Sequence, residues 1–298
     1  MTGFFSALAR RITVNNKITR ARDATIGCSP RKRWSNMPTD QLRRRRTVVV
    51  ALAAGGLALA VVLVAIASSG STGARAAVQS RPLAGKVIGI DPGHNGLNYT
   101  DPAFLAKQIW NGREWEDCDT TGTETAGGYT EARFNFNVAS YLRADLIRLG
   151  AKVVMTRQNN HGIGPCVNRR ARILNGAHAK VSIDIHADYG PVSGRGFSIL
   201  EPVADGPNNK VIRPSIRFGR LVHAAMTRYT AMRVSTYYGR NGYIFRNDLA
   251  GLNLTTMPKV LIECGNMHNR RDAALLTRPR VQRRIAFALA QAIVKFLT

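Results

Sequence analysis

The sequence predicts an α/β domain with one mostly parallel, twisted sheet flanked by helices. From residue 84 to the C-terminus, short apolar runs alternate with longer stretches of helical periodicity. Several of the apolar runs end at Gly or Pro, which favour turns. Hydrophobic residues make up 45% of the chain, enough to bury a core, which excludes a chain that is disordered throughout. Strands that alternate with helices are typical of βαβ units and a parallel sheet.

The expected strands are short apolar runs, often bounded by turn residues. They cover residues 86–91, 151–156, 179–186, 194–202 and 258–264. The expected helices between and after them cover residues 130–149, 167–178, 214–229 and 281–297. Residues 95–129 are rich in Gly, Thr, Asn and acidic residues without clear periodicity, and we expect a long loop there.

The helix that begins near residue 130 has the clearest pattern. Thr130 is a favourable N-cap residue, and Phe134, Val138 and Leu142 follow at helical spacing. Gly150 closes the pattern, as glycine commonly does at the end of a helix. This segment is therefore expected to pack one apolar face against the sheet.

The N-terminal part differs in composition from the domain. Residues 1–76 carry 13 Lys and Arg but 2 Asp and Glu, and residues 47–67 carry no charge. As a helix, this run is long enough to span a hydrocarbon layer of ~30 Å. The four arginines before it predict that its N-terminal side stays in the cytoplasm and that the rest is exported. We expect a basic arm (1–46), a hydrophobic leader (47–67), a linker (68–83) and the exported domain (84–298).

Two interpretations of the leader remain open. A signal peptide needs a small-residue cleavage site, and Ala74-Arg75-Ala76 before Ala77 provides one. An uncleaved leader would instead anchor the protein in the membrane through residues 47–67. Met37 is an alternative start, because a compact basic leader follows it. In each case the domain is expected in the periplasm, in the cell wall or outside the cell.

The net charge of +25 is not taken as a sign of nucleic-acid binding. The arm before the leader contributes a large part of this charge, and such an arm is explained by export topology. We expect no nucleic-acid partner, and we expect the protein to be a monomer.

The cysteines predict one disulfide bond. Cys28 precedes the leader, whereas Cys118, Cys166 and Cys264 follow it and would meet an oxidising environment. An odd number of exported thiols predicts one pair and one free cysteine. Cys118 and Cys166 lie in loop-like sequence, while Cys264 ends an apolar strand, so we expect a Cys118–Cys166 bond. No two cysteines have the C-x-x-C spacing of a structural zinc site.

Polar residues stand where the expected strands end. His94 follows the first strand, His186 ends the third, and Glu263 nearly ends the last. The carboxyl ends of parallel strands border the crevice in which such folds bind ligands. Glu131 joins this edge from the first turn of its helix. Two imidazoles and two carboxylates together predict a divalent metal site, with three ligands and a fourth group as general base, as in catalytic zinc sites.

Five motifs in order carry a resemblance to a known family. They are IGIDPGHNG (88–96), Glu131 at a helix start, VVMTR (153–157), SIDIHAD (182–188) and VLIECGNMHN (260–269). Together they resemble the zinc-dependent N-acetylmuramoyl-L-alanine amidases of the amidase-3 family, over residues 86–298. The resemblance implies that His94, Glu131 and His186 bind Zn²⁺ and that Glu263 is the catalytic carboxylate. It also implies hydrolysis of the amide between N-acetylmuramic acid and the L-alanine of the stem peptide in peptidoglycan.

The chain departs from the family pattern around the second histidine. Asp184 and Asp188 stand where the family usually has Ser and Asn. Asp184 shares a strand face with His186 and is a candidate to orient that imidazole, and Asp91 is a second candidate for a supporting role. The alternative for Asp184 is an acid that pairs with one of the many arginines.

The other histidines and the arginines have non-catalytic interpretations. His161, His178, His223 and His268 lie in loops or helices without evident partners, and we expect structural or surface roles. Arg170 matches an arginine of the family pattern and is expected to support the fold.

Two rival functions remain open from the sequence. A zinc peptidase would cleave within the stem peptide rather than at its junction with the sugar. A wall-associated binding protein would keep the fold without catalysis, although the four intact site residues argue against it.

Overall fold

Six strands form one sheet in the order β4-β1-β5-β8-β6-β7 in the computed structural model. The strands are β1 (Val87–Pro92), β4 (Lys152–Met155), β5 (Val181–Asp188), β6 (Ser198–Pro202), β7 (Tyr243–Arg246) and β8 (Lys259–Asn266). Neighbouring strands are parallel except for β6 and β8, which are antiparallel. The prediction of a mostly parallel sheet is confirmed.

The structure describes residues 81–298. The basic arm, the hydrophobic leader, Cys28, Met37 and nearly all of the linker fall outside this range. Among the described residues, no helix is both long and apolar enough to cross a membrane.

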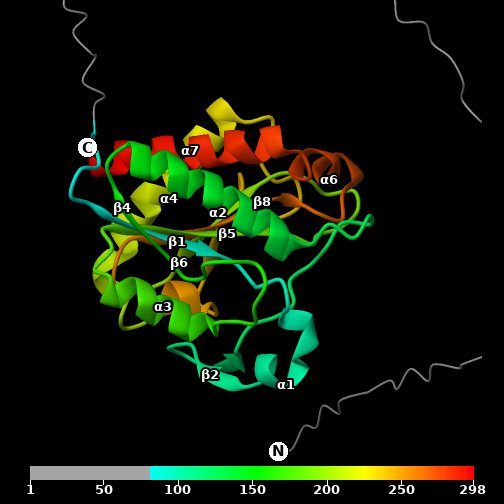
Figure 1. Cartoon of the computed structure of the whole chain (residues 1–298), viewed down its shortest axis with the longest axis horizontal. Coiled ribbons are helices and arrows are strands. Elements are labelled where there is room, and N and C mark those ends of the chain that lie inside the picture. Colours follow the sequence, from blue (N-terminus) through cyan, green and yellow to red (C-terminus); the bar gives the residue numbers. More distant parts are fainter. Residues whose placement is uncertain (1–80) are drawn as a thin grey trace, which may run out of the picture. The chain divides into compact units, whose positions relative to one another are not determined.

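Helices cover both faces of the sheet (Figure 1). The helices α2 (Glu131–Arg148), α4 (Ile212–Tyr229) and α7 (Pro279–Leu297) lie on one face, and α3 (Val167–Gly176) lies on the other. Shorter helices are α1 (Pro102–Leu105), α5 (Ala250–Asn253) and α6 (Arg270–Leu276), with 3-10 turns η1 (Asn98–Thr100) and η2 (Asn209–Val211). The main apolar core lies between the sheet and the helices α2, α4 and α7.

The helix α2 forms as its sequence pattern predicts. The Thr130 hydroxyl accepts a hydrogen bond from the backbone N–H of Arg133 at its N-terminus. Phe134 and Val138 are fully buried in the main core, and Gly150 has a φ of 96° just after the helix. This packing fixes the direction of the first turn, which carries one of the candidate ligands.

The expectation of one long loop over 95–129 is wrong in part. This stretch contains η1, α1 and a small hairpin of β2 (Gln108–Trp110) and β3 (Trp115–Asp117). Strands of three residues are too short to show a period in the sequence. The rings of Trp110 and Trp115 meet edge to face at 5.7 Å across the hairpin and support it. The edge strand β7 also lacked a clear sequence signal.

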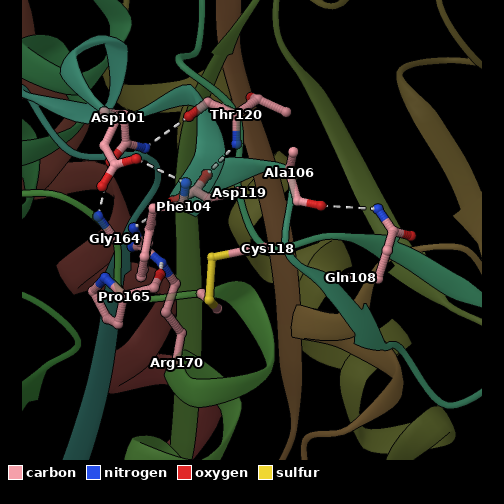
Figure 2. The surroundings of a disulfide bond; sticks show 12 residues. Asp101, Phe104, Ala106, Gln108, Cys118, Asp119, Thr120, Gly164, Pro165 and Arg170 are labelled. Carbon is pink, nitrogen blue, oxygen red and sulfur yellow. Dashed lines mark hydrogen bonds and ion pairs between the residues drawn. A yellow bond between two sulfur atoms is a disulfide. The ribbon is translucent and has the colours of Figure 1, made fainter.

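A disulfide joins the end of this hairpin to α3. The structure pairs Cys118, directly after β3, with Cys166, the N-cap residue of α3, and Figure 2 shows the bond beside Asp119 and Arg170. Cys264 is buried and, within residues 81–298, the one free cysteine. Whether the bond forms in the exported protein stays a prediction.

Reduction of this bond is expected to lower the melting temperature clearly. The initial rate measured at low temperature, where the domain stays folded, should change much less. The two cysteines are 48 residues apart, and closing a loop of that length is worth about 4 kcal/mol in the chain-entropy model. Peptide mapping under non-reducing conditions checks the pairing. A cross-link to Cys264, or three free thiols, would contradict it.

Candidate metal centre

The three predicted ligands come together at the carboxyl edge of the sheet. His94 follows β1, Glu131 opens α2 and His186 lies near the end of β5. One ligand atom from each lies within 4.8 Å of the others. Glu131 lies between the two imidazoles, with Oε2 3.3 Å from Nε2 of His94 and Oε1 2.8 Å from Nδ1 of His186. The rings meet edge to face, with 4.9 Å between their centroids.

The backbone around these residues is shaped for close approach. A Cβ on Gly93 would lie 2.1 Å from the His186 ring, so only glycine fits there. His94 has a φ of 56°, a conformation that costs a non-glycine residue about 1–3 kcal/mol. Gly122 (φ 72°) closes the opposite side, where a Cβ would be 2.7 Å from His94 and 2.9 Å from Glu131. The local chain therefore holds the three side chains in a narrow space.

Glu263 lies next to this group without joining it. It stands on β8 in register with His186 on the neighbouring strand β5. Its Oε2 atom is buried and has no hydrogen-bond partner among the described residues. Burial raises the pKa of Glu263 to about 8, because the opposing effect of His186 is smaller. An unpartnered carboxylate oxygen beside a ligand cluster is suited to take a proton from a polar molecule held there.

The electrostatics of the cluster favour a cation. Burial lowers the pKa of His94, but Glu131 and Asp119 outweigh it and raise the value to about 9. The pKa of His186 is raised well above its usual value, since Asp184 and Glu131 outweigh burial. Burial alone would raise the pKa of Glu131. The opposite effect of the two imidazoles is larger, and the pKa lies well below its usual range. Two nitrogens and a carboxylate in an acidic setting match the donor set of zinc.

Each histidine also contacts a carboxylate through its other ring nitrogen. Nδ1 of His94 lies 3.1 Å from Oδ1 of Asp119 and 3.1 Å from the carbonyl oxygen of Thr120. Nε2 of His186 lies 3.2 Å from Oδ1 of Asp184, at ion-pair distance. Carboxylates in these positions fix the tautomer and orientation of metal-binding imidazoles. Asp119 was missed from the sequence because it stands in a stretch without periodicity, where proximity to Cys118 is its one distinguishing feature.

A buried chain of alternating charges connects those two carboxylates. Asp119 pairs with Arg170 at 3.0 Å, and Arg170 pairs with Asp91 at 3.2 Å. Asp91 pairs with Lys259 at 2.7 Å, and Lys259 lies 3.5 Å from the second carboxylate, Asp184. All five side chains are buried. Arg170 is buried within these ion pairs, and the burial of Lys259 had no signal in the sequence.

The remaining histidines among the described residues lie outside the ligand cluster. His223 contacts the carbonyl of Asn241 and stacks on Tyr243. His268 contacts the carbonyl of Gly190 and stacks on Tyr189. The expectation that these two lack partners is therefore wrong, because ring stacking is not visible in the sequence.

Comparisons with known proteins agree on one family. Residues 88–295 match the family described as N-acetylmuramoyl-L-alanine amidase. An N-acetylmuramoyl-L-alanine amidase of Mycobacterium tuberculosis is 37% identical over 217 residues, covering 72% of this chain and 88% of that protein. The structure is similar to that of the amidase Ami1 from Mycobacterium abscessus, with a TM-score of 0.68, 38% identity, and coverage of 72% and 100% of the two chains. The amidase AmiC2 of Nostoc punctiforme shares the fold at 21% identity, with a TM-score of 0.54 and coverage of 73% and 98%.

Proposed function

This chain belongs to the N-acetylmuramoyl-L-alanine amidase family, and we propose that it cleaves its substrate with one Zn²⁺ held by His94, Glu131 and His186. It is an amide hydrolase that acts on peptidoglycan, at the bond between N-acetylmuramic acid and L-alanine. The observation that carries the zinc proposal is the convergence of the three ligand atoms within 4.8 Å. Three protein ligands leave room for a water molecule and the substrate, as catalytic zinc sites require.

We assign both proton transfers of the reaction to the carboxylate of Glu263. Zinc in this site would supply Lewis-acid chemistry, polarising the scissile carbonyl and lowering the pKa of a water molecule. Glu263 accepts the proton of the attacking water at its unpartnered Oε2 and then delivers it to the leaving amine of L-alanine.

The location follows from the substrate and the sequence. Peptidoglycan lies outside the cytoplasmic membrane, and the hydrophobic leader predicts export of residues 84–298. We propose a periplasmic, wall-associated or secreted monomer, held at the membrane through residues 47–67 if the leader is not cleaved.

Product analysis tests the proposed reaction. The zinc-loaded protein is incubated with purified muropeptides, and the products are separated and identified by mass. The expected result is a free amine on L-alanine with the peptide intact. Cleavage inside the peptide would instead identify a zinc peptidase, and bound zinc without turnover would identify a binding protein.

The buried charge chain is assigned a positioning role. Asp119 and Asp184 hold the outer nitrogens of the two histidines, and Asp91, between Arg170 and Lys259, holds the cations that neutralise both carboxylates. The arrangement keeps each imidazole turned toward Glu131 without touching the substrate. We propose for Asp184 and Asp91 the supporting roles expected from the sequence.

Lys259→Met is expected to weaken zinc binding by ~10-fold, the lower end of the range for supporting groups. Methionine fills a similar volume but removes the ammonium group that pairs with Asp184 and leaves Asp91 with Arg170 alone, so the carboxylate that holds His186 shifts. Chelator competition measures the dissociation constant for zinc, and the visible spectrum of the cobalt-substituted protein reports ligand geometry.

Val222→Ala is the matched control. Val222 is fully buried in α4, in the main core, which lies on the other face of the sheet from Lys259. Its truncation should lower the melting temperature without changing zinc affinity. An unchanged zinc affinity and cobalt spectrum in folded Lys259→Met would contradict the positioning role. Asp184→Asn provides a second variant if Lys259→Met does not fold.

A further inference from the structure

A second feature of the molecule lies beside the proposed zinc site and has no role in the mechanism. A pocket of about 800 Å³ opens along residues 121–126 and reaches Tyr99 and Tyr189. This volume is within the ~300–1,000 Å³ of typical ligand pockets. Its inner wall touches the site, because the backbone N–H of Thr123 donates to Oε2 of Glu131 at 3.0 Å. A substrate whose carbonyl reaches the ligands therefore has this pocket directly beside it.

Tyr189 presents a fixed aromatic surface to the pocket. The residue is 57% exposed, and its ring stacks on His268, with centroids 4.2 Å apart and planes 9° apart. Nδ1 of His268 lies 3.0 Å from the carbonyl oxygen of Gly190, which holds the supporting ring. Because the tyrosine is already ordered, binding against its free face loses little side-chain entropy. Tyr99, 67% exposed, adds a second aromatic ring to the same pocket.

The other lining groups suit a neutral ligand rich in hydroxyl and amide groups. Thr121, Thr123 and Thr125 contribute hydroxyls. Glu124 is the one carboxylate among the lining residues, and no Lys or Arg is among them. A stem peptide, with its carboxylates, would call for cations that this pocket does not provide. A second pocket, lined by His94 and His186 themselves, holds about 280 Å³. Its several acids outnumber its one arginine, Arg170, which already pairs with Asp91 and Asp119, so it suits neither a disaccharide nor an acidic peptide.

We propose that the larger pocket binds the saccharide of the substrate, with Tyr189 as the surface on which a pyranose ring packs. The C–H face of a sugar is apolar and its edge carries hydroxyl and acetamido groups, which matches an aromatic ring bordered by threonines. The assignment rests on the proposed function, and it orients the substrate. The sugar lies toward Tyr189 and Tyr99, and the peptide leaves the site in another direction.

The test compares two ligands that differ in the sugar. These are N-acetylmuramoyl-L-alanyl-D-isoglutamine and D-lactoyl-L-alanyl-D-isoglutamine, titrated calorimetrically into zinc-loaded Glu263→Gln so that hydrolysis does not interfere. The Glu263→Gln protein should bind the muramoyl ligand more tightly than the lactoyl ligand. Adding Tyr189→Ala to it should reduce this preference, measured as the ratio of the two dissociation constants, by ~10-fold. Tyr189→Phe keeps the ring and should retain the preference.

Phe245→Ala is the control for loss of an exposed aromatic ring. Phe245 is 61% exposed on β7 and does not line the pocket, so the preference should not change. A preference that survives Tyr189→Ala, or a Glu263→Gln protein that binds both ligands equally, overturns the saccharide assignment. Failure of the amidase proposal is seen separately, as muropeptides left intact by the wild-type protein in the product analysis.

Discussion

Glu263→Gln is expected to retain zinc and to lose hydrolysis by ~10²–10⁴-fold, the usual contribution of general acid–base catalysis. Glutamine keeps the shape of the side chain, but its amide cannot accept the proton of the attacking water. Glu263 stands beside the ligand cluster and is not one of the three residues whose ligand atoms converge, so metal retention should not depend on its charge. Zinc content by mass spectrometry and turnover of a muropeptide are measured on the same preparation.

Glu201→Gln is the matched control for this substitution. Glu201 is also a buried glutamate on a strand, β6, but it lies outside the ligand cluster. This variant should keep both zinc and turnover. If Glu263→Gln instead loses zinc in proportion to activity, Glu263 is a ligand and the assignment as base is wrong.

His94→Ala and His186→Ala are each expected to abolish both zinc retention and hydrolysis. Each removes one of the three proposed ligands, so the loss of affinity should exceed the ~10–100-fold that removal of a supporting group causes. His94 and His186 flank Glu131 at 3.3 and 2.8 Å, and the two remaining groups cannot complete the donor set. Equilibrium dialysis against a zinc buffer measures the effect.

His223→Ala is the control for loss of an imidazole. His223 stacks on Tyr243 and contacts a backbone carbonyl outside the ligand cluster, so its removal should leave zinc binding unchanged. Near-stoichiometric zinc at unchanged affinity in either ligand variant would contradict the ligand assignment.

The parts of this molecule that the sequence predicts are those with local signals. The apolar runs of β1, β5 and β8 and the apolar stripe of α2 are regular over six or more residues, long enough for a period to be seen. His94, His186 and Glu263 could be assigned to one edge because the carboxyl ends of parallel strands meet there. The convergence of the two histidines with Glu131, and the position of Glu263 beside them, are therefore consequences of topology.

The parts that could not be predicted depend on contacts between distant segments. Asp119 is positioned by Arg170, 51 residues later. Lys259 begins β8, and the sequence alone would suggest a solvent-exposed lysine there. Asp91, 168 residues earlier, instead supplies a carboxylate at 2.7 Å that offsets the cost of burying the ammonium group. Tyr189 and His268 form a stack only because β5 and β8 are neighbours. No local pattern records such pairs.

The wide separation of the ligands along the chain links metal uptake to folding. The loop after β1, the first turn of α2 and the end of β5 meet only when the sheet and its covering helix are assembled, so an unfolded chain offers no comparable site. A cation that binds the native state alone stabilises it by ~2.7 kcal/mol when its free concentration is a hundred times the dissociation constant. For a zinc ion at the proposed site, scarcity in the surroundings would thus lower the stability of the folded enzyme as well as its rate, and a metal-starved population would hold more unfolded chains.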